Sequence, residues 1–295
     1  FFSRRIGRDE SILAGVRLTG QAGPFSVGVL NIETGPDLRR LFGGASTNNT
    51  VARVRADVFP RTTIGGIVPH LADDVRQNTA AGIDGQLRFG QNSELTGWVS
   101  QVWDTVGPTS SAGQLSGQLG TNRTGVSASF SAVGRAYDPA LGFVRRRDYR
   151  RFGSRGYWNL PVDAPLGIAR VSGALDGSVF WGLDGELQSS EIELESYGEN
   201  SNQDFAGGGV RSVFERLNAP FTIRDGETVQ AGDYRFTQAF INAGTDEARA
   251  ISVGVGAQVG GFFSGTQVEL EGDIEWRLSP GFGIGADVSH SIIDL

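Results

Sequence analysis

Apolar and polar residues alternate one by one over long stretches of this chain. The clearest stretch is Val268–Trp276, where Glu269, Glu271, Asp273 and Glu275 stand between apolar positions. Successive side chains of a β-strand point to opposite faces, so this stretch predicts a strand with one apolar and one strongly charged face. Water must reach the charged face, and about nine to eleven residues are what a tilted strand needs to cross the hydrocarbon of a bilayer. The stretch therefore predicts a membrane-spanning strand.

The same alternation recurs along the chain, in residues 52–58, 81–89, 126–132, 191–195 and 282–289. No window of about 11 residues or more has the 3.6-residue period of an amphipathic helix. Turn-forming residues separate about sixteen strand-like stretches, at residues 11–20, 24–33, 50–59, 62–69, 79–90, 93–103, 112–120, 123–134, 149–160, 167–181, 183–197, 206–217, 233–243, 248–260, 266–278 and 281–292. The sequence predicts an all-β fold, an antiparallel transmembrane β-barrel of about 16 or more strands.

The connections between these strands are of two kinds. Short ones, such as 90–92, 121–123 and 279–281, have the composition of tight hairpin turns. Longer ones, rich in Pro, Asp, Asn, Gly and charge, lie near residues 34–49, 70–78, 104–111, 135–148, 198–205 and 218–232. Outer-membrane barrels show this asymmetry between short turns and long loops. Aromatic residues near strand ends are also typical of their interfacial girdles, although such residues favour strands in general.

Composition adds three constraints. The net charge of -7 argues against nucleic-acid binding, which needs a basic surface. No run of about 18 apolar residues exists, so no transmembrane helix is expected, whereas a barrel hides half of its residues from lipid and has an unremarkable mean hydropathy. The chain does not begin with Met and ends while a strand-like pattern is still running. We expect residues 1–295 to be a single barrel domain that is incomplete at both ends relative to its parent protein.

Several segments resemble a known family. Residues 1–7, 13–20 and 27–31 are similar to the opening hairpin of a bacterial outer-membrane barrel family, and residues 137–151 (YDPALGFVRRRDYRR) resemble that family's most recognisable mid-barrel segment. Ala231–Phe236 is similar to the start of a later strand. Members of this family carry an N-terminal carbohydrate-binding domain of the family-nine type before a barrel of unknown function. The resemblance implies export, an outer-membrane location, a missing carbohydrate-binding domain upstream and further strands downstream. It offers no catalytic residues.

Charged residues at alternate positions are the candidates for a lumen-facing polar surface. They are Arg53, Arg55, Asp57, Asp84, Arg88, Glu191, Glu193, Glu195, Glu269, Glu271, Asp273 and Glu275. Stripes of carboxylates favour cations and can hold Ca²⁺ through oxygen ligands. We prefer the alternative, in which they pair with facing arginines such as Arg53, Arg55 and Arg88 in a hydrated lumen.

A second candidate is the cluster Arg145, Arg146, Arg147, Arg150 and Arg151. Guanidinium groups bind phosphates and carboxylates bidentately, so the cluster is a candidate anion site for lipopolysaccharide phosphates or for an anionic solute at a constriction. The alternative is a solvated loop that enters a strand, or pairing with lumen carboxylates.

Evidence for an enzyme is weak. His70 and His290 have no His, Cys or Glu partners at zinc-ligand spacing. Residues 281–286 fit a dinucleotide-binding pattern, but they lie in a strand-like stretch and open no helix, so we reject that assignment. We expect no catalytic residues, no metal and no cofactor.

The sequence thus favours an integral outer-membrane β-barrel with a charged polar lumen, acting as a pore, a conduit or a membrane anchor for a partner or an attached binding domain. Its expected partners are membrane lipid, lipopolysaccharide, a carbohydrate bound through the missing N-terminal domain, and a protein partner or plug. The chief alternative is a soluble, secreted, carbohydrate-binding (lectin-like) all-β protein, which would bury its apolar faces against a second sheet. An envelope hydrolase is a third, weaker alternative.

Overall fold

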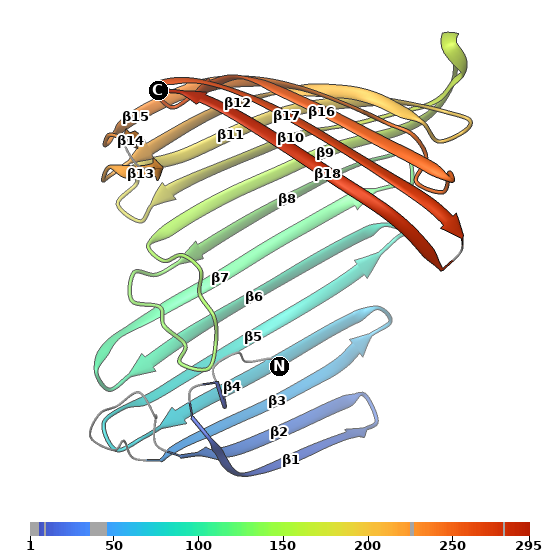
Figure 1. Ribbon diagram of the computed structural model, residues 1–295. Helices are drawn as coiled ribbons and strands as arrows, with labels where there is room; N and C mark the ends of the chain where they lie inside the picture. Colours follow the sequence, from blue (N-terminus) through green and yellow to red (C-terminus); the bar gives the residue numbers. More distant parts are fainter. Residues whose placement is uncertain (1–5, 9, 36–45, 225–226, 280) are drawn as a thin grey trace. The chain divides into compact units, whose positions relative to one another are not determined.

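The computed structural model describes residues 6–8, 10–35, 46–224, 227–279 and 281–295. Sixteen strands form one sheet in which neighbours in the chain are neighbours in the sheet (Figure 1). The pairings given for these strands are antiparallel. A two-stranded hairpin, β13 (Phe221–Arg224) with β14 (Glu227–Val229), and a short 3-10 turn at Pro165–Gly167 complete the described part of the chain. No described helix is long and apolar enough to cross a membrane.

The strands of the large sheet are β1 (Ile12–Ala22), β2 (Phe25–Thr34), β3 (Thr47–Phe59), β4 (Thr62–Ala72), β5 (Gln77–Phe89), β6 (Ser93–Asp104), β7 (Gly107–Gly120), β8 (Thr124–Val133), β9 (Tyr149–Ala164), β10 (Ile168–Gly182), β11 (Leu187–Asn200), β12 (Phe205–Leu217), β15 (Gly232–Gly244), β16 (Ile251–Phe262), β17 (Gly265–Ser279) and β18 (Phe282–Asp294). The predicted all-β class and the strand number are confirmed.

Two of the predicted connections are wrong. The predicted loop at 104–111 is a turn of residues 105–106, because β7 begins at Gly107 and pairs there with Asp104 of β6. The first residues of β7, Gly-Pro-Thr-Ser-Ser, carry no apolar alternation and so gave no strand signal. The predicted loop at 218–232 contains the β13–β14 hairpin. Three predicted features lie partly outside the described residues. They are the opening-hairpin resemblance (residues 1–5), the long loop at 34–49 (residues 36–45) and the turn at 279–281 (Pro280).

The sheet residues group into two units, which we describe separately. Unit 1 comprises Phe1–Gln118, Ser129–Arg151 and Gly182–Asp184. Unit 2 comprises Leu119–Ala128, Phe152–Trp181 and Gly185–Leu295.

In unit 1, residues that pair across neighbouring strands form rows across the sheet. Apolar residues pair with apolar ones, so the alternation within each strand is shared by its neighbours. One row runs through six strands as Val27, Val54, Gly66, Ile83, Val99 and Gly113. The adjacent row, on the opposite face, runs Ser26, Arg55, Gly65, Asp84, Trp98 and Gln114. Unit 1 therefore has an apolar face and a polar face, and Ile83 on the apolar face is 63% exposed.

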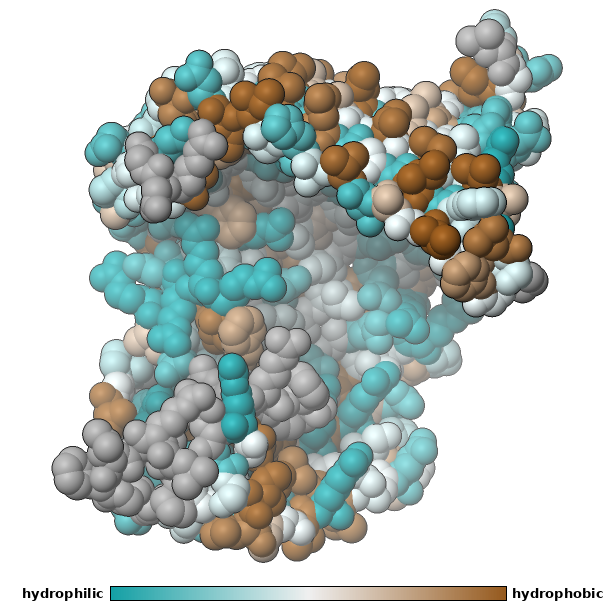
Figure 2. All heavy atoms as spheres, in the orientation of Figure 1, coloured by the Kyte–Doolittle hydropathy of each residue, from teal (hydrophilic) through white to brown (hydrophobic). Residues whose placement is uncertain are grey.

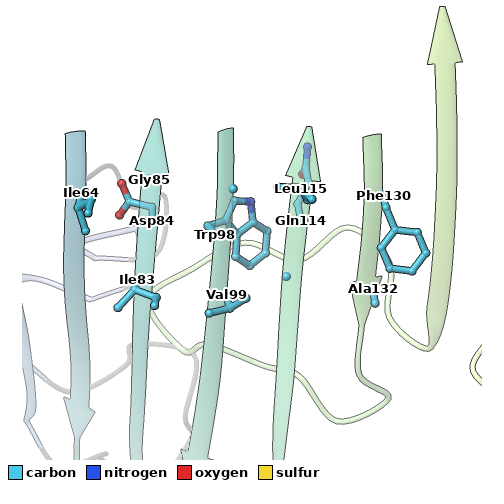
Figure 3. Close-up of a pocket in the computed structure, with 12 residues that line it drawn as sticks. Ile64, Ile83, Asp84, Gly85, Trp98, Val99, Gln114, Leu115, Phe130 and Ala132 are labelled. Carbon is cyan, nitrogen blue, oxygen red and sulfur yellow. The ribbon is translucent and has the colours of Figure 1, made fainter. Parts of the chain in front are cut away.

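Glycine residues leave a hollow on the apolar face of unit 1. Gly85 and Gly97 are paired across β5 and β6 and, with Gly113, they leave space of about 550 Å³ between larger side chains (Figure 3). Ile64, Ile83, Val99, Leu115 and Phe130 line this space. Ile64, Ile83 and Val99 around it are each more than half exposed, so the hollow does not add to a core.

Unit 2 repeats the two-faced arrangement. One row runs Leu194, Val210, Ala239, Val259, Val268 and Ile292, and the next row, on the other face, begins Glu193, Arg211 and Gln238. Leu194, Val259 and Ile292 are each more than half exposed. Apolar side chains, with hydrophilic ones among them, gather along the top of the view in Figure 2, where the strands labelled in Figure 1 include β12, β16 and β17.

Aromatic rings lie against glycine backbone on the strands of unit 2. A Cβ at Gly207 would overlap the carbonyl oxygen of Ser196 and lie 2.6 Å from the ring of Tyr197. A Cβ at Gly209 would lie 2.7 Å from the ring of Phe240. Only glycine allows the rings to pack this closely onto the sheet.

We predict that Gly207→Ala lowers the free energy of unfolding by about 1–3 kcal/mol, because the added methyl group must displace backbone or the Tyr197 ring. The matched control is Gly156→Ala on β9, where a Cβ would have nothing within 4 Å, and its effect should stay within about 0.5 kcal/mol. Denaturant titration followed by tryptophan fluorescence measures both. Equal stability of the two variants would contradict the packing described for Gly207.

Candidate functional site

The predicted polar residues of unit 1 lie on the polar face and take part in ion pairs. Arg53 pairs with Asp84 at 2.7 Å, and Arg55 lies 4.0 Å from Asp57. Arg88 pairs with Glu94 at 2.7 Å, a partner that the sequence alone did not suggest. Arg53 and Asp84 lie on β3 and β5, so this ion pair spans β4 between them.

The acidic stripe on β11 pairs with arginines of unit 2. Arg211 lies 3.8 Å from Glu193, and Arg155 lies 3.5 Å from Glu195. Arg155 also pairs with Asp176 at 2.7 Å. Sequence reasoning missed these partners because the register between strands, not the spacing along the chain, selects them.

Fewer carboxylates of the acidic stripe on β17 are in ion pairs than on β11. Glu275 pairs with Arg277 at 3.0 Å, and Glu269 accepts a hydrogen bond from Gln267 at 3.2 Å. Among the described residues, Glu271 and Asp273 are in no ion pair. The described part of the chain also holds no group of three or more His, Cys, Asp or Glu side chains suited to a metal ion.

The connection between β8 and β9, residues 134–148, is folded onto the polar face of unit 1; we call it the folded segment. Gly134 N–H donates to the carbonyl oxygen of Ser111 at 2.9 Å, which attaches the start of the segment to β7. Two turns then follow, closed by hydrogen bonds from Tyr137 N–H to Gly134 O at 3.2 Å and from Gly142 N–H to Pro139 O at 2.9 Å. Hydrophilic residues cover much of the surface around this connection in Figure 2.

A small apolar core lies under the folded segment. Tyr137 packs with Ala80, Val102 and Ala112, which are among the buried residues of unit 1. Ala80 and Val102 are cross-strand partners, and Ala112 pairs with the neighbouring Ser100, so all three lie on the polar face near one end of β5–β7. Small apolar residues interrupt the polar face there, which gives the segment an apolar surface on which to pack.

Asn78 fixes the segment by hydrogen bonds. Its side chain is 2% exposed. The amide nitrogen donates to the carbonyl oxygen of Asp138 at 3.0 Å and to the carboxylate of Asp104 at 2.7 Å. The amide oxygen accepts from Ala140 N–H at 2.8 Å. Asn78 therefore links β5 to the segment through two of its backbone groups.

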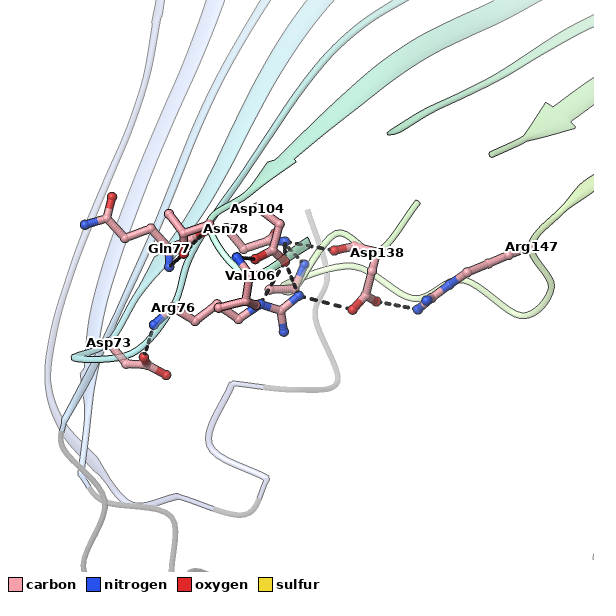
Figure 4. Close-up of polar contacts among 10 residues, drawn as sticks. Asp73, Arg76, Gln77, Asn78, Asp104, Val106, Asp138 and Arg147 are labelled. Carbon is pink, nitrogen blue, oxygen red and sulfur yellow. Dashed lines mark hydrogen bonds and ion pairs between the residues drawn. The ribbon is translucent and has the colours of Figure 1, made fainter. Parts of the chain in front are cut away.

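An ionic cluster continues this attachment (Figure 4). Asp73 accepts hydrogen bonds from the backbone N–H groups of Val75 and Arg76, forming a side-chain turn that orients Arg76. Arg76 Nε donates to Asp104 at 2.8 Å, and its terminal nitrogen lies 3.2 Å from Asp138. Arg147 closes the chain of contacts by donating to Asp138 at 2.5 Å. The hydrogen bond to Asp104 raises the pKa of Arg76 above its ordinary value, so the guanidinium stays charged.

The predicted arginine cluster is thus divided by its contacts. Arg147 is bound to Asp138, and the guanidinium of Arg146 lies 6.0 Å from the ring centre of Tyr149. Arg145 and Arg150 are exposed. Sequence reasoning identified these arginines but missed Arg76, Asn78 and Asp104, which lie on other strands or turns.

We predict that Asn78→Ala releases the folded segment, because the hydrogen bonds from Ala140 N–H and to the carbonyl of Asp138 are lost, at about 0.5–1.5 kcal/mol each. Trypsin should then cut at Arg145–Arg147 faster than in the unsubstituted protein, as measured by mass spectrometry of timed digests. Asn202→Ala, in the exposed turn after β11, is the control and should leave the cleavage rate unchanged. Unchanged cleavage in Asn78→Ala would contradict the attachment.

In comparisons with known proteins, the chain matches no family model, no curated protein and no solved structure. The resemblance to the barrel family therefore remains a prediction from residues 6–7, 13–20, 27–31, 137–151 and 231–236 of the described chain, and the site above is argued from its own geometry.

Proposed function

We propose that this chain is an integral outer-membrane β-barrel whose polar face lines a hydrated, charged lumen, and that it serves as a pore or conduit. The observation that carries the proposal is the pair of faces found in both units: one face exposes aliphatic side chains, and the other carries charged and polar groups, many of them paired. A role as a membrane anchor for a partner or for an attached domain is compatible with the same architecture.

The exposed apolar face supports lipid as its surroundings. In unit 2, Ile241 and Val288 are each 67% exposed, and Leu270 between them in the sheet is 50% exposed. Leaving such side chains in water costs about 25 cal/mol for each Å² of apolar surface. A bilayer removes this cost, and its flexible acyl chains can also fill a hollow such as the one above Gly85 and Gly97.

The ends of the strands support the same assignment. In unit 1 the connections 23–24, 60–61 and 90–92 at one end of the sheet are all short, whereas the other end has the two long ones, 35–46 and 134–148, beside the short 73–76 and 105–106. Phe25, Phe59 and Phe89 lie next to the short turns and are exposed by 51%, 72% and 41%. Exposed aromatic residues at strand ends are typical of the membrane interface.

A membrane location places one further demand on the sheet. Backbone N–H and C=O groups without partners cost several kcal/mol each in lipid, so every strand edge must be paired. We therefore propose that the sheet closes in the membrane, either through β1 and β18 themselves or through further strands that pair with them.

The soluble lectin-like alternative lacks a comparable supporting observation. It requires a second layer over each apolar face, and aliphatic side chains on those faces, such as Ile83, Val99 and Ile241, are exposed instead. Purification decides between the two proposals: a barrel needs detergent and migrates differently on a gel before and after boiling. A monodisperse, detergent-free protein would overturn the membrane proposal.

We predict that Leu270→Arg destabilises the protein in lipid vesicles by about 2–4 kcal/mol, the cost of an arginine on the lipid face near the bilayer midplane. Glu271→Arg is the matched control, because Glu271 is the next residue on β17, is also exposed and lies on the polar face. It should change stability by less than about 0.5 kcal/mol. Urea unfolding of vesicle-inserted protein measures both, and equal, small effects would argue for water on both faces.

A further inference from the structure

The apolar side chains on the apolar face of unit 1 stop before the strands do. At the end that carries the folded segment, one row on this face is polar; we call it the outer polar row, and on β2–β6 it consists of Asn31, Thr50, His70, Thr79 and Trp103. The next row beyond it begins with Glu33 and Asn48. The row before it, toward the short turns, begins with Val29, Ala52 and Val68. The change from apolar to polar side chains therefore falls at one level on neighbouring strands.

Hydrogen bonds join the polar side chains at this level across strands. Asn31 Nδ2 donates to Asn48 Oδ1 at 2.9 Å, and Asn48 Nδ2 donates to the Glu33 carboxylate at 2.9 Å. Farther along the row, His70 Nδ1 lies 2.8 Å from Thr79 Oγ1. Hydrocarbon offers such groups no further partners and disfavours the charge of Glu33, whereas water and lipid headgroups accept both.

The opposite face of the sheet changes in the reverse sense at the same level. The residues that adjoin Thr50, Thr79 and Trp103 in the chain, and so point to the other face, are buried and apolar. They are Val51, Ala80 and Val102, which are 3%, 4% and 1% exposed. Ala80 and Val102 belong to the core under the folded segment. This end of unit 1 is therefore built like a water-soluble protein, with polar groups on the apolar-face side and an apolar core on the other side.

Exposed aromatic residues lie at both ends of the apolar region. Trp103, in the outer polar row, is 45% exposed, and its cross-strand partner is Thr79 of β5. Phe89, on the same face at the other end of β5, is 41% exposed. From Thr79 to Phe89 the strand covers about 33 Å, which at the usual tilt of a membrane strand is about 25 Å, the height of the apolar band of outer-membrane barrels. Exposed aromatic side chains are typical of the two membrane interfaces.

We propose that the outer polar row is the membrane boundary of unit 1, and that the strand ends beyond it, with the folded segment, stand in the layer of headgroups and water. This inference rests on the proposed membrane location. The surface on the short-turn side of the row meets acyl chains, and the surface beyond the row meets lipid headgroups and water. At this end the core under the folded segment removes apolar surface from water, as lipid does for the rest of unit 1.

The test is the reactivity of single cysteines of the full chain toward a charged maleimide in bilayer discs, where both sides of the membrane are open to the reagent. Gln77 and Ile83 are exposed residues on the same face of β5, on the two sides of the boundary. Gln77→Cys should react within about threefold of Gln91→Cys, the water reference in the turn between β5 and β6. Ile83→Cys should react more than about tenfold more slowly, because a thiolate does not form in hydrocarbon and a charged reagent does not enter it.

A second pair of variants repeats the comparison on β4. Ala72 lies beyond the boundary, and Ile64 lies on the same face within the apolar region. Ala72→Cys should again react faster than Ile64→Cys. Each rate is divided by the rate of the same variant in urea, which removes differences in intrinsic reactivity, and gel migration before and after boiling shows that each variant is folded.

The outcomes distinguish this inference from the proposed function. If Gln77→Cys and Ala72→Cys react as slowly as Ile83→Cys and Ile64→Cys, the hydrocarbon extends past the outer polar row, and the boundary is overturned while the membrane location stands. Fast reaction of Ile83→Cys and Ile64→Cys means that water covers the apolar face, which overturns the membrane location and the boundary with it.

Discussion

The structure depends on strand register. Side chains alternate between the two faces of a strand, so a shift of one residue would exchange all apolar and polar positions of that strand. In unit 1 the register instead aligns Val27, Val54, Ile83 and Val99 in one row. In unit 2 it aligns Leu194, Val210, Ala239 and Val268. Two continuous faces of opposite character result, and both the site and the proposed location follow from them.

The two faces are stabilised by different means. Ion pairs such as Arg53–Asp84 and Arg155–Asp176 cross-link strands on the polar face, where water partly screens them and makes each worth little by itself. The apolar face has few such contacts, and its stabilisation comes mainly from removing apolar surface from water. The folded segment is the place where the polar face of unit 1 builds a core of its own, around Tyr137 and Val102. That core explains why a connection with so many arginines is ordered.

Sequence reasoning predicted the strands well because the signal is local. An alternation such as that of Val268–Trp276 can be recognised without knowing any neighbour, and β17 indeed spans Gly265–Ser279. The attachment of the folded segment was not predictable in this way, because Asn78 and Ala140 are distant in sequence and the small residues Ala80 and Ala112 look unremarkable in a strand. The partners of Glu193 and Glu195 were missed for the same reason: Arg211 and Arg155 face them only through the register. The β13–β14 hairpin is too short to show a pattern.

The most direct test asks what touches each face. The chain contains no cysteine, so a single introduced cysteine can carry a fluorophore at a known position. Leu115 and Ser116 are neighbours on β7; Leu115 faces Gly97 on the apolar face, and Ser116 faces Thr96 on the polar face. In vesicles, lipid with brominated chains should quench a fluorophore at Leu115→Cys and spare one at Ser116→Cys, whereas aqueous iodide should do the reverse. Quenching of both positions by iodide, and of neither by brominated lipid, would contradict the account.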